Sequence, residues 1–415
     1  MYPYITQNSR LHYFDDHGIL LAQNKRYMIN EIDIFILEKI DGKKSISEIT
    51  DEIAKEIGTS DKVRVKDVIM ECIYSKSKDI LFSDYPNPQS FVKTGMKNKK
   101  VPLDLVISLT NKCHCNCVHC FKSCNIKGTD SIDYEILTKT LDYLKGKTLN
   151  LQLTGGEPML YDRFFDILKY SINNFNTTIT TTGALINKDN IKYFKGINCV
   201  QVSLYAENED KFDKITRTKG SFVNTLNGIK EVVKAGIYIS AACIVKKDNM
   251  HNIEDIIKLA VDYGIKSLRF GIFIPGGRGV DLKDSWCLSV NDMEELTSEI
   301  AILSNKYKQY IDVKSWSNDR QNMDIDDKYE SLSCGSGLYR WFISEKGYIK
   351  PCEFIPDEIY SIHNILDTDI SKIIENWSLQ TMSRSLKYWD ELLRNKNCTI
   401  KDICPVMDNY LKNCI

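Results

Sequence analysis

This sequence of 415 residues contains no long apolar run and only 9 prolines, and its net charge is close to zero. No hydrophobic stretch approaches the ~18 residues of a membrane-spanning helix, which excludes an integral membrane protein. Apolar content is ordinary and glycine is not periodic, which excludes collagen, coiled coil and wholesale disorder. A formal net charge of −1 provides no basic field for nucleic acid. Internal repeats, a P-loop, a GxGxxG fingerprint and an HExxH motif are also absent.

A secretory signal is missing as well. The start, MYPYITQNSRLHYF, has no basic stretch followed by an apolar stretch, so we expect a cytoplasmic protein with reduced thiols. Cysteine is the residue in excess, because five of the 14 fall between residues 113 and 124 and five between 334 and 414. Crowded thiolates repel one another unless a metal neutralises them, so both groups predict metal sites. The other four, Cys72, Cys199, Cys243 and Cys287, are typical of small buried hydrophobic residues.

Zinc is the competing metal for the first cysteine group. Structural zinc sites favour paired C-x2-C knuckles. The group offers one such pair, Cys117 and Cys120, and no second C-x2-C occurs in the chain. The spacing therefore favours an iron–sulfur cluster over zinc.

Three regions follow one another along the chain. Residues 1–90 are predicted to form a small sheet, with strands in HYF, GILLA and KRYMIN, and three helices. Ser45 or Ser47 is the expected N-cap of the second helix, and Gly42 is expected to end the first. Residues 91–100 are polar and basic and are predicted as a linker. Residues 101–310 alternate strands and helices, which predicts an α/β parallel sheet or partial (β/α)6 barrel. The predicted strands are 104–110, 149–154, 177–182, 199–205, 237–245 and 267–273.

The third region, residues 311–415, is less periodic and contains cysteines. RWFISEKGYIKPCEF is predicted to form a hairpin with Gly347 in its turn. In parallel α/β folds the chemistry gathers at the carboxyl ends of the strands, and the informative motifs of this chain do follow its predicted strands.

The first strand is followed by LTNKCHCNCVHCF, in which Cys113, Cys117 and Cys120 form C-x3-C-x2-C. An electron-transfer 4Fe–4S cluster takes four cysteines, so three would leave one iron open. This motif, with an aromatic residue after it, resembles the signature of the radical S-adenosylmethionine (radical SAM) enzymes. The resemblance implies a TIM-like partial barrel in which these three cysteines hold a SAM-binding 4Fe–4S cluster and SAM is cleaved to a 5′-deoxyadenosyl radical. Cys115 and Cys124 leave other triads open, such as Cys117, Cys120 and Cys124.

The resemblance also implies SAM contacts at later strand ends. In TGGEP (154–158), glycines allow close backbone approach and Glu157 can accept a hydrogen bond from the SAM amino group. Thr181 and Thr182 either bond the ribose or cap a turn. Gly277 would let the adenine approach, and Arg278 beside it is expected to be structural. The implied SAM-binding residues are Phe121, Gly155, Gly156, Glu157, Thr181, Thr182, Ser203, Arg217 and Gly277.

The second cysteine group resembles the SPASM and twitch domains of the same family. Cys334, Gly347 and Cys352 give C-x12-G-x4-C, and Cys398 and Cys404 have the x5 spacing, but the flanking cysteines of a full SPASM domain are absent. We therefore expect one auxiliary 4Fe–4S cluster on Cys334, Cys352, Cys398 and Cys404. Cys414 is a spare thiol or replaces one of them. The cluster would relay electrons or bind substrate.

The amino-terminal region resembles the winged-helix-like recognition element of enzymes that mature ribosomally synthesised and post-translationally modified peptides (RiPPs). With the two other regions it implies a RiPP maturase that binds a precursor peptide through residues 1–90 and takes electrons from a flavodoxin or ferredoxin. The expected product is a thioether (sactipeptide-like) or a carbon–carbon crosslink, and epimerisation stays open. The alternatives are a side-chain or small-molecule dehydrogenase resembling sulfatase activators, which would not need residues 1–90, and a non-catalytic iron–sulfur sensor.

Overall fold

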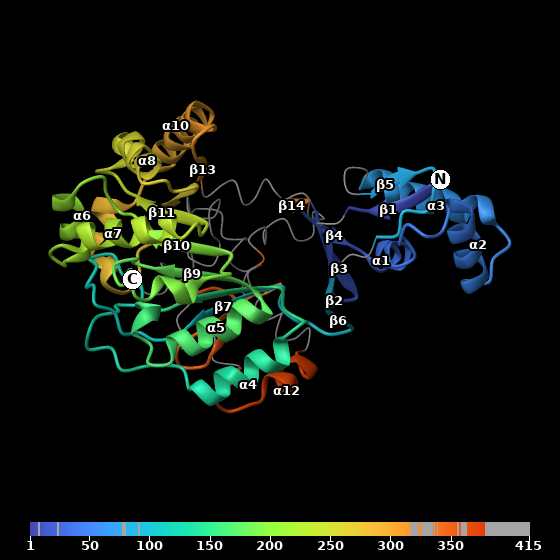
Figure 1. Ribbon diagram of the computed structural model, residues 1–415, viewed down its shortest axis with the longest axis horizontal. Helices are drawn as coiled ribbons and strands as arrows, with labels where there is room; N and C mark the ends of the chain where they lie inside the picture. The colour runs from blue at the N-terminus through green and yellow to red at the C-terminus, as the bar shows by residue number, and fades with distance from the viewer. Residues whose placement is uncertain are drawn as a thin grey trace. The chain divides into compact units, whose positions relative to one another are not determined.

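The computed structural model describes residues 1–6, 9–22, 25–76, 80–89, 92–315, 323–324, 335, 337, 339–354, 357 and 363–377 (Figure 1). The chain divides into two compact units. Unit 1 contains residues 1–103 and 320–333, and unit 2 contains residues 104–319 and 334–415. None of the described helices combines the length and the apolar character needed to cross a bilayer.

The core of unit 2 is a sheet of parallel strands in the order β13-β12-β11-β10-β9-β8-β7-β15, with β16 antiparallel at its end. The prediction of an α/β parallel sheet is confirmed, and each of the six predicted strands coincides with a strand of this sheet. The strands are β7 Asp104–Ser108, β8 Asn150–Thr154, β9 Asn176–Thr181, β10 Cys199–Ser203, β11 Ile239–Val245, β12 Ser267–Ile272, β13 Asp312–Ser315, β15 Arg340–Ile343 and β16 Ile349–Lys350.

Side chains alternate along the central strands of the sheet. In β8, Leu151 and Leu153 are buried, whereas Gln152 and Thr154 are half-buried, and β9, β10 and β11 show the same period of two. One face therefore packs as core, and in β8, β9 and β10 the other carries mainly hydroxyl and amide groups. The helices are α4 Tyr134–Leu144, α5 Phe164–Asn174, α6 Glu209–Thr216, α7 Ser221–Lys234, α8 Ile253–Asp262, α9 Lys283–Trp286, α10 Val290–Tyr307 and α12 Ile370–Glu375.

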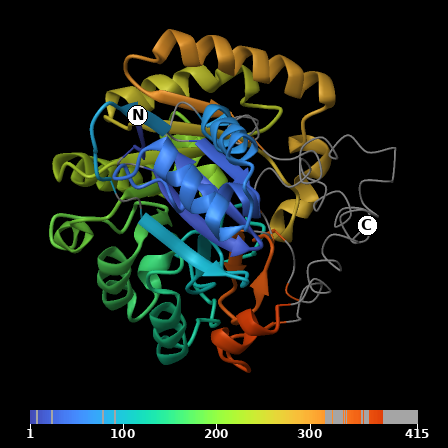
Figure 2. The ribbon, with the colours of Figure 1, turned by 90° about the vertical axis from the view of Figure 1, so that its right-hand side faces the viewer.

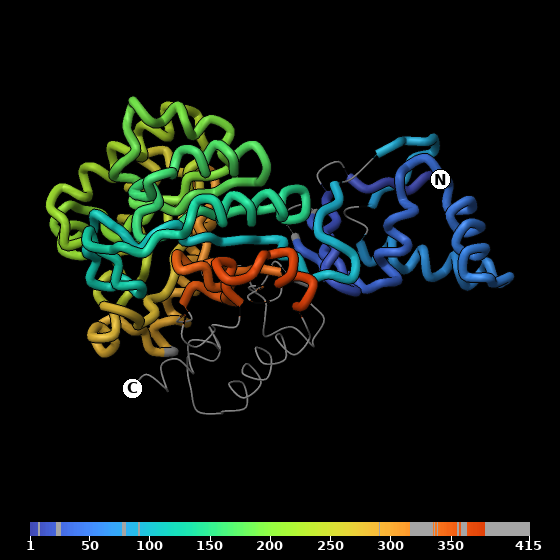
Figure 3. Tube along the Cα trace, turned by 90° about the horizontal axis from the view of Figure 1, so that it is seen from below, coloured from blue at the N-terminus to red at the C-terminus, as the bar shows by residue number. Residues whose placement is uncertain are grey.

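Helices α8 and α10 lie side by side at the β13 end of the sheet (Figures 1 and 2). Lys306 and Tyr307 of α10 both contact the Glu254 carboxylate of α8 at 2.7 Å. At the opposite end, the predicted hairpin is confirmed as β15 and β16, with Gly347 at φ +83° in the turn. The pairing of β15 with β7, which extends the main sheet, was not predicted (Figure 3).

Unit 1 has one sheet in the order β14-β4-β3-β2-β6 and a separate pair, β1 with β5. The predicted three strands and three helices are all present. The strands are β1 Tyr2–Ile5, β2 Arg10–Asp15, β3 His17–Ala22, β4 Lys25–Ile29, β5 Ile80–Ser83, β6 Val92–Lys97 and β14 Met323–Asp324, and the helices are α1 Glu31–Leu37, α2 Ile46–Glu56 and α3 Lys62–Ser75.

Two local predictions in unit 1 need correction. The linker prediction for residues 91–100 is wrong for β6, which pairs in parallel with β2. Its polar side chains suit an edge strand, where backbone pairing does not require an apolar face. Gly42 does not stop α1, which ends at Leu37 with Glu38 as its C-cap. Of the two predicted N-caps, Ser45 is the cap and forms a capping box with Glu48.

Candidate active site

The five cysteines of the first group lie together in the loop that follows β7. Cys113, Cys115 and Cys124 are buried in contact with one another, and Cys117 and Cys120 pack against them half-buried. The backbone amide of Cys124 donates to Cys120 Sγ at 3.3 Å. The structure thus brings the predicted triad together, and it brings Cys115 and Cys124 with it. The choice of Cys113, Cys117 and Cys120 as ligands stays a prediction.

The donor set of this loop suits a cluster better than a single ion. Among the described residues, no three His, Cys, Asp or Glu side chains converge closely enough to hold one metal ion. A cubane cluster does not need such convergence, because each thiolate binds a different iron. Hydrogen bonding from Cys124 lowers the pKa of the Cys120 thiol to about 6, so this group favours the thiolate that binds iron.

Backbone contacts from two distant segments hold the cysteine loop in place. At the end of α6, the carbonyls of Ile215 and Thr216 accept hydrogen bonds from Val118 and Asn116 at 2.9 and 3.0 Å. From the segment after β12, Arg278 donates from Nε to the carbonyl of Cys117 at 3.0 Å and from a terminal nitrogen to the carbonyl of Cys124 at 2.7 Å. Its backbone amide donates to the carbonyl of Cys120 at 3.1 Å. This geometry agrees with the structural role expected for Arg278.

The glycines of TGGEP pack against the start of the cysteine loop. A Cβ on Gly155 would lie 2.5 Å from the carbonyl oxygen of Thr110, and one on Gly156 would lie 2.4 Å from that of Lys112. Both distances are shorter than real Cβ contacts. The close approach of the two loops therefore explains these glycines without a ligand, and their contact with SAM stays a prediction.

Glu157 is fully buried at the end of this motif and accepts four hydrogen bonds. Oε1 accepts from Thr181 Oγ1 at 2.7 Å and from the Met159 amide at 3.3 Å. Oε2 accepts from the amide and the hydroxyl of Thr182 at 2.9 and 2.7 Å. The structure therefore joins three predicted SAM-binding residues into one cluster. In this arrangement Thr181 and Thr182 orient the carboxylate, and an incoming ammonium would replace a threonine hydroxyl, which can rotate away.

Replacing Glu157 with glutamine is expected to destabilise unit 2 by about 1–3 kcal/mol, the cost of a buried donor left unpaired. A hydroxyl can turn to become an acceptor, but each carboxylate oxygen also faces a backbone N–H. In either orientation the NH2 group of the new glutamine therefore faces a backbone N–H, which cannot become an acceptor. Chemical denaturation of the apo-protein measures the change. The exposed Glu294→Gln is the matched control, and an unchanged unfolding free energy for Glu157→Gln would contradict this account.

The other predicted SAM contacts lie around the same loop. Ser203 is half-buried at the carboxyl end of β10. Arg217 is exposed and has a left-handed backbone at φ +50°, next to the Thr216 carbonyl that holds the cysteine loop. The ring of Phe121 lies 4.8 Å from that of Phe354. A Cβ on Gly277 would lie 2.4 Å from the Phe121 carbonyl oxygen, so loop packing already explains this glycine.

Two histidines of the cysteine loop were not predicted as site residues. His119 is buried against the rings of Tyr205 and Trp286, at 4.6 and 5.8 Å. Burial, helped by nearby Lys246 and Arg278, lowers the pKa of His119 to about 4, so the ring is neutral at neutral pH. His114 Nε2 lies 3.5 Å from Thr182 Oγ1. Within the described structure the Nδ1 atoms of both rings are buried without a hydrogen-bond partner. Their positions within the cysteine motif are the only signal in the sequence.

The second cysteine group is described in part. Cys352 is half-buried just after β16. The other predicted auxiliary ligands lie outside the described residues, and they are Cys334, Cys398, Cys404 and Cys414.

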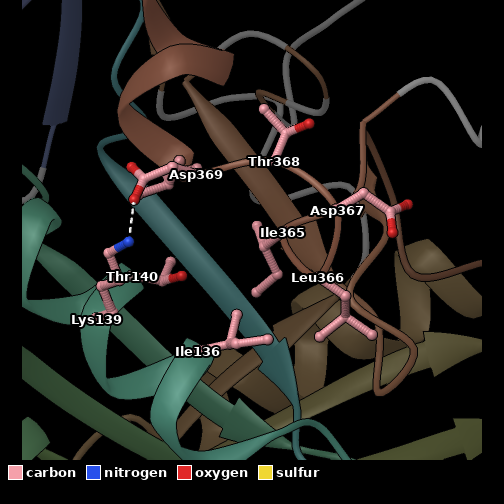
Figure 4. A pocket seen from close by; sticks show the side chains of 9 residues that line it. Ile136, Lys139, Thr140, Ile365, Leu366, Asp367, Thr368 and Asp369 are labelled. Atoms are coloured by element: carbon pink, nitrogen blue, oxygen red, sulfur yellow. Dashed lines mark ion pairs between the residues drawn. The ribbon is translucent and has the colours of Figure 1, made fainter.

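A cavity of about 170 Å³ lies between α4 and the turn before α12 (Figure 4). It is lined by Ile136, Thr140, Ile365 and Leu366, and the ion pair between Lys139 and Asp369, at 2.7 Å, lies at its side. None of its lining residues belongs to the cysteine loop or to the Glu157 cluster. The cavity is therefore separate from the candidate active site.

Comparison with known sequences places this site in a family. Residues 107–260 match the model of the Radical SAM superfamily. The antilisterial bacteriocin subtilosin biosynthesis protein AlbA of Bacillus subtilis (strain 168) is 24% identical over 432 residues, which cover 100% of this chain and 92% of AlbA. The sporulation killing factor maturation protein SkfB of the same organism is 20% identical over 283 residues, which cover 68% of this chain and 66% of SkfB.

Among solved structures, Streptococcus suis SuiB bound to S-adenosylmethionine is similar with a TM-score of 0.67 at 16% identity, and the match covers 99% of this chain and 96% of SuiB. SuiB bound to the precursor peptide SuiA is similar with a TM-score of 0.64. At this identity the likeness concerns the fold. The match to the family model, together with the cysteine loop at the carboxyl end of β7, identifies residues 107–260 as a radical SAM domain.

Proposed function

We propose that this chain is a maturase of a ribosomally synthesised precursor peptide. The observation that carries the proposal is that the similarity to AlbA, named for subtilosin biosynthesis, extends over the whole chain, unit 1 included. The similarity to SkfB and to the SuiB–SuiA complex supports it. A sulfatase-activator-like dehydrogenase would leave residues 1–90 without a role, and a non-catalytic sensor would not require the combined cysteine and Glu157 sites.

The 4Fe–4S cluster and SAM of this domain, when bound, supply a 5′-deoxyadenosyl radical that removes a hydrogen atom from the peptide. Cys113, Cys117 and Cys120 would hold the cluster. Glu157, which Thr181 and Thr182 orient, would accept hydrogen bonds from the SAM amino group. Phe121, Gly155, Gly156, Ser203, Arg217 and Gly277 would complete the SAM pocket.

The product we propose is a thioether between a cysteine sulfur and a carbon of the same peptide. Forming this bond removes two hydrogens: the carbon loses one as an atom, and the thiol loses the other as a proton while one electron leaves. That electron needs an acceptor. We assign this role to an auxiliary 4Fe–4S cluster held by Cys334, Cys352, Cys398 and Cys404, with Cys414 as a spare thiol or in place of one of them. A carbon–carbon crosslink has the same balance and is the second candidate.

Unit 1 is proposed to bind the leader of the precursor peptide, as a winged-helix-like recognition element. An extended peptide can add to the edge of a sheet, where free backbone groups give affinity and side-chain pockets give specificity. The β-sheet of unit 1 ends at β6 on one side and at the short β14 on the other. We further propose that the protein works in the cytoplasm, where thiols stay reduced, and receives electrons from a flavodoxin or ferredoxin.

Leader dependence tests this function with the full-length protein. The test requires a precursor peptide, to be sought among short cysteine-rich peptides encoded by neighbouring genes and used with its leader and as the core segment alone. We expect the core alone to be modified at least about tenfold more slowly, since docking of the leader raises the local concentration of the core. Adding the leader as a separate peptide should inhibit the intact precursor. Equal rates for both substrates would contradict leader binding.

A further inference from the structure

The loop that carries the first cysteine group lies against the hairpin that precedes Cys352. Strand β15 pairs in parallel with β7, and β7 leads directly into the cysteine loop. Figure 3 shows the hairpin (red) beside β7 (cyan). The cysteine loop and the hairpin, more than 200 residues apart in the sequence, therefore adjoin neighbouring strands of one sheet. Two side-chain contacts join them.

The first contact is a buried ion pair between Lys122 and Glu345. Lys122 Nζ donates to the Glu345 carboxylate and, at 2.6 Å, to the hydroxyl of Ser108 at the end of β7. The Lys122 and Glu345 side chains are only 13% and 7% exposed. The Lys122 nitrogen also lies 5.7 Å from the centre of the Phe342 ring in β15.

The second contact is aromatic. Phe121, the residue before Lys122, packs its ring 4.8 Å from that of Phe354. Phe354 lies two residues after Cys352, so the two contacts flank the segment from the turn of the hairpin to this cysteine. The contacts therefore determine how the Cys352 segment meets the cysteine loop.

A buried ion pair is weak evidence for stability, because well-packed apolar side chains in its place are often as stable or more stable. The pair instead restricts the geometry, since each buried charge has its partner only when the hairpin and the cysteine loop are correctly aligned. The chain provides a contrast in the same turn. Lys346 pairs with Asp130 at 3.9 Å, with both side chains 40% or more exposed, where water screens the attraction.

We propose that Lys122 and Glu345 are positioning residues that hold the Cys352 segment in register with the SAM-cluster loop. This inference rests on the proposed function for its consequence: the register sets the path by which an electron passes between the two cysteine groups. Loss of the pair should leave SAM cleavage intact and disturb the relation between the two sites.

Full-length Lys122→Met, the double variant Lys122→Met/Glu345→Leu and the control Lys346→Met test the proposal. In metal-free protein, hydrogen exchange of the Ser344 amide, which donates to the Tyr348 carbonyl across the hairpin, and of the Lys350 amide in β16 should be about tenfold faster in Lys122→Met than in the parent, because the hairpin opens more often. The control should match the parent. In the double variant the apolar pair should restore slow exchange. Unchanged exchange in Lys122→Met would overturn the proposal.

A second readout separates position from stability. In reconstituted, dithionite-reduced protein, we expect the magnetic interaction between the two clusters, seen by electron paramagnetic resonance, to weaken in both Lys122→Met and the double variant. Parent-like spectra in the double variant would show that the ion pair stabilises the hairpin without positioning the two clusters, which would contradict the proposal. The amount of 5′-deoxyadenosine formed from SAM alone should be unchanged in all variants. If the parent itself forms none, the proposed function fails, whereas the exchange experiment still decides on the ion pair.

Discussion

Replacing Cys117 with alanine is expected to reduce 5′-deoxyadenosine formation from SAM to the level of the buffer control. Three thiolates leave one iron open for SAM, and losing a ligand leaves the cluster with two protein bonds. Cys113→Ala and Cys120→Ala should behave alike. The measurement is anaerobic turnover with SAM and dithionite, quantified by chromatography, with the iron content of each reconstituted variant determined beside it.

The neighbouring cysteines provide the matched controls, because they lie in the same cluster of thiols. Cys115→Ala and Cys124→Ala should retain SAM cleavage within a few-fold of the parent. The opposite pattern, in which Cys124→Ala is inactive and Cys113→Ala is active, would show that Cys117, Cys120 and Cys124 are the ligands. Five single variants thus decide which three cysteines bind the cluster, a choice that neither the spacing nor the packing of the loop settles.

Replacing Arg278 with glutamine is expected to have the second largest effect. The guanidinium donates to the carbonyls of Cys117 and Cys124, on both sides of Cys120. Losing both hydrogen bonds should destabilise the protein by about 3 kcal/mol, since charge-assisted hydrogen bonds are each worth about 1.5–3 kcal/mol. The loop should then hold its cluster poorly, so iron bound after reconstitution should fall as well. Denaturant unfolding of apo-protein and iron analysis measure the two effects.

The variant Arg278→Lys separates geometry from charge. A lysine side chain at this position would keep the positive charge but lacks the fork that reaches two carbonyls at once. We therefore expect Arg278→Lys to be nearly as destabilised as Arg278→Gln. The exposed Arg163, paired with Asp166, provides the control, and Arg163→Gln should change little. If Arg278→Gln bound as much iron as the parent and unfolded with the same free energy, the hydrogen bonds of Arg278 would have no role in holding the loop.

The strands of unit 2 could be predicted from the sequence because their signals are local. Apolar and β-branched runs such as Ile239–Val245 alternate with amphipathic helices, and parallel strands place the following motifs at one edge. The cysteine loop, TGGEP and the threonines after β9 could therefore be placed from the sequence. Strand β6 could not, because its polar sequence resembles a linker and its strand conformation depends on pairing with β2.

The contacts that build the site could not be predicted, because they join segments without any local pattern. Lys122 and Glu345 are separated by 223 residues, and each alone is an ordinary charged residue. Thr181 and Thr182 were predicted from a family motif, yet their role in orienting Glu157 became visible only when both loops were in place. Arg278 follows a glycine turn, and its carbonyl partners in the cysteine loop lie more than 150 residues away.

The mass of the precursor peptide after anaerobic incubation with this protein, SAM and a reductant tests the central proposal most directly. If the chain is a thioether-forming maturase, the peptide becomes two hydrogen atoms lighter for each crosslink, one of its cysteines no longer reacts with a thiol reagent, and 5′-deoxyadenosine accumulates with the product. An unchanged peptide mass together with 5′-deoxyadenosine formation would contradict the proposed maturation of that peptide.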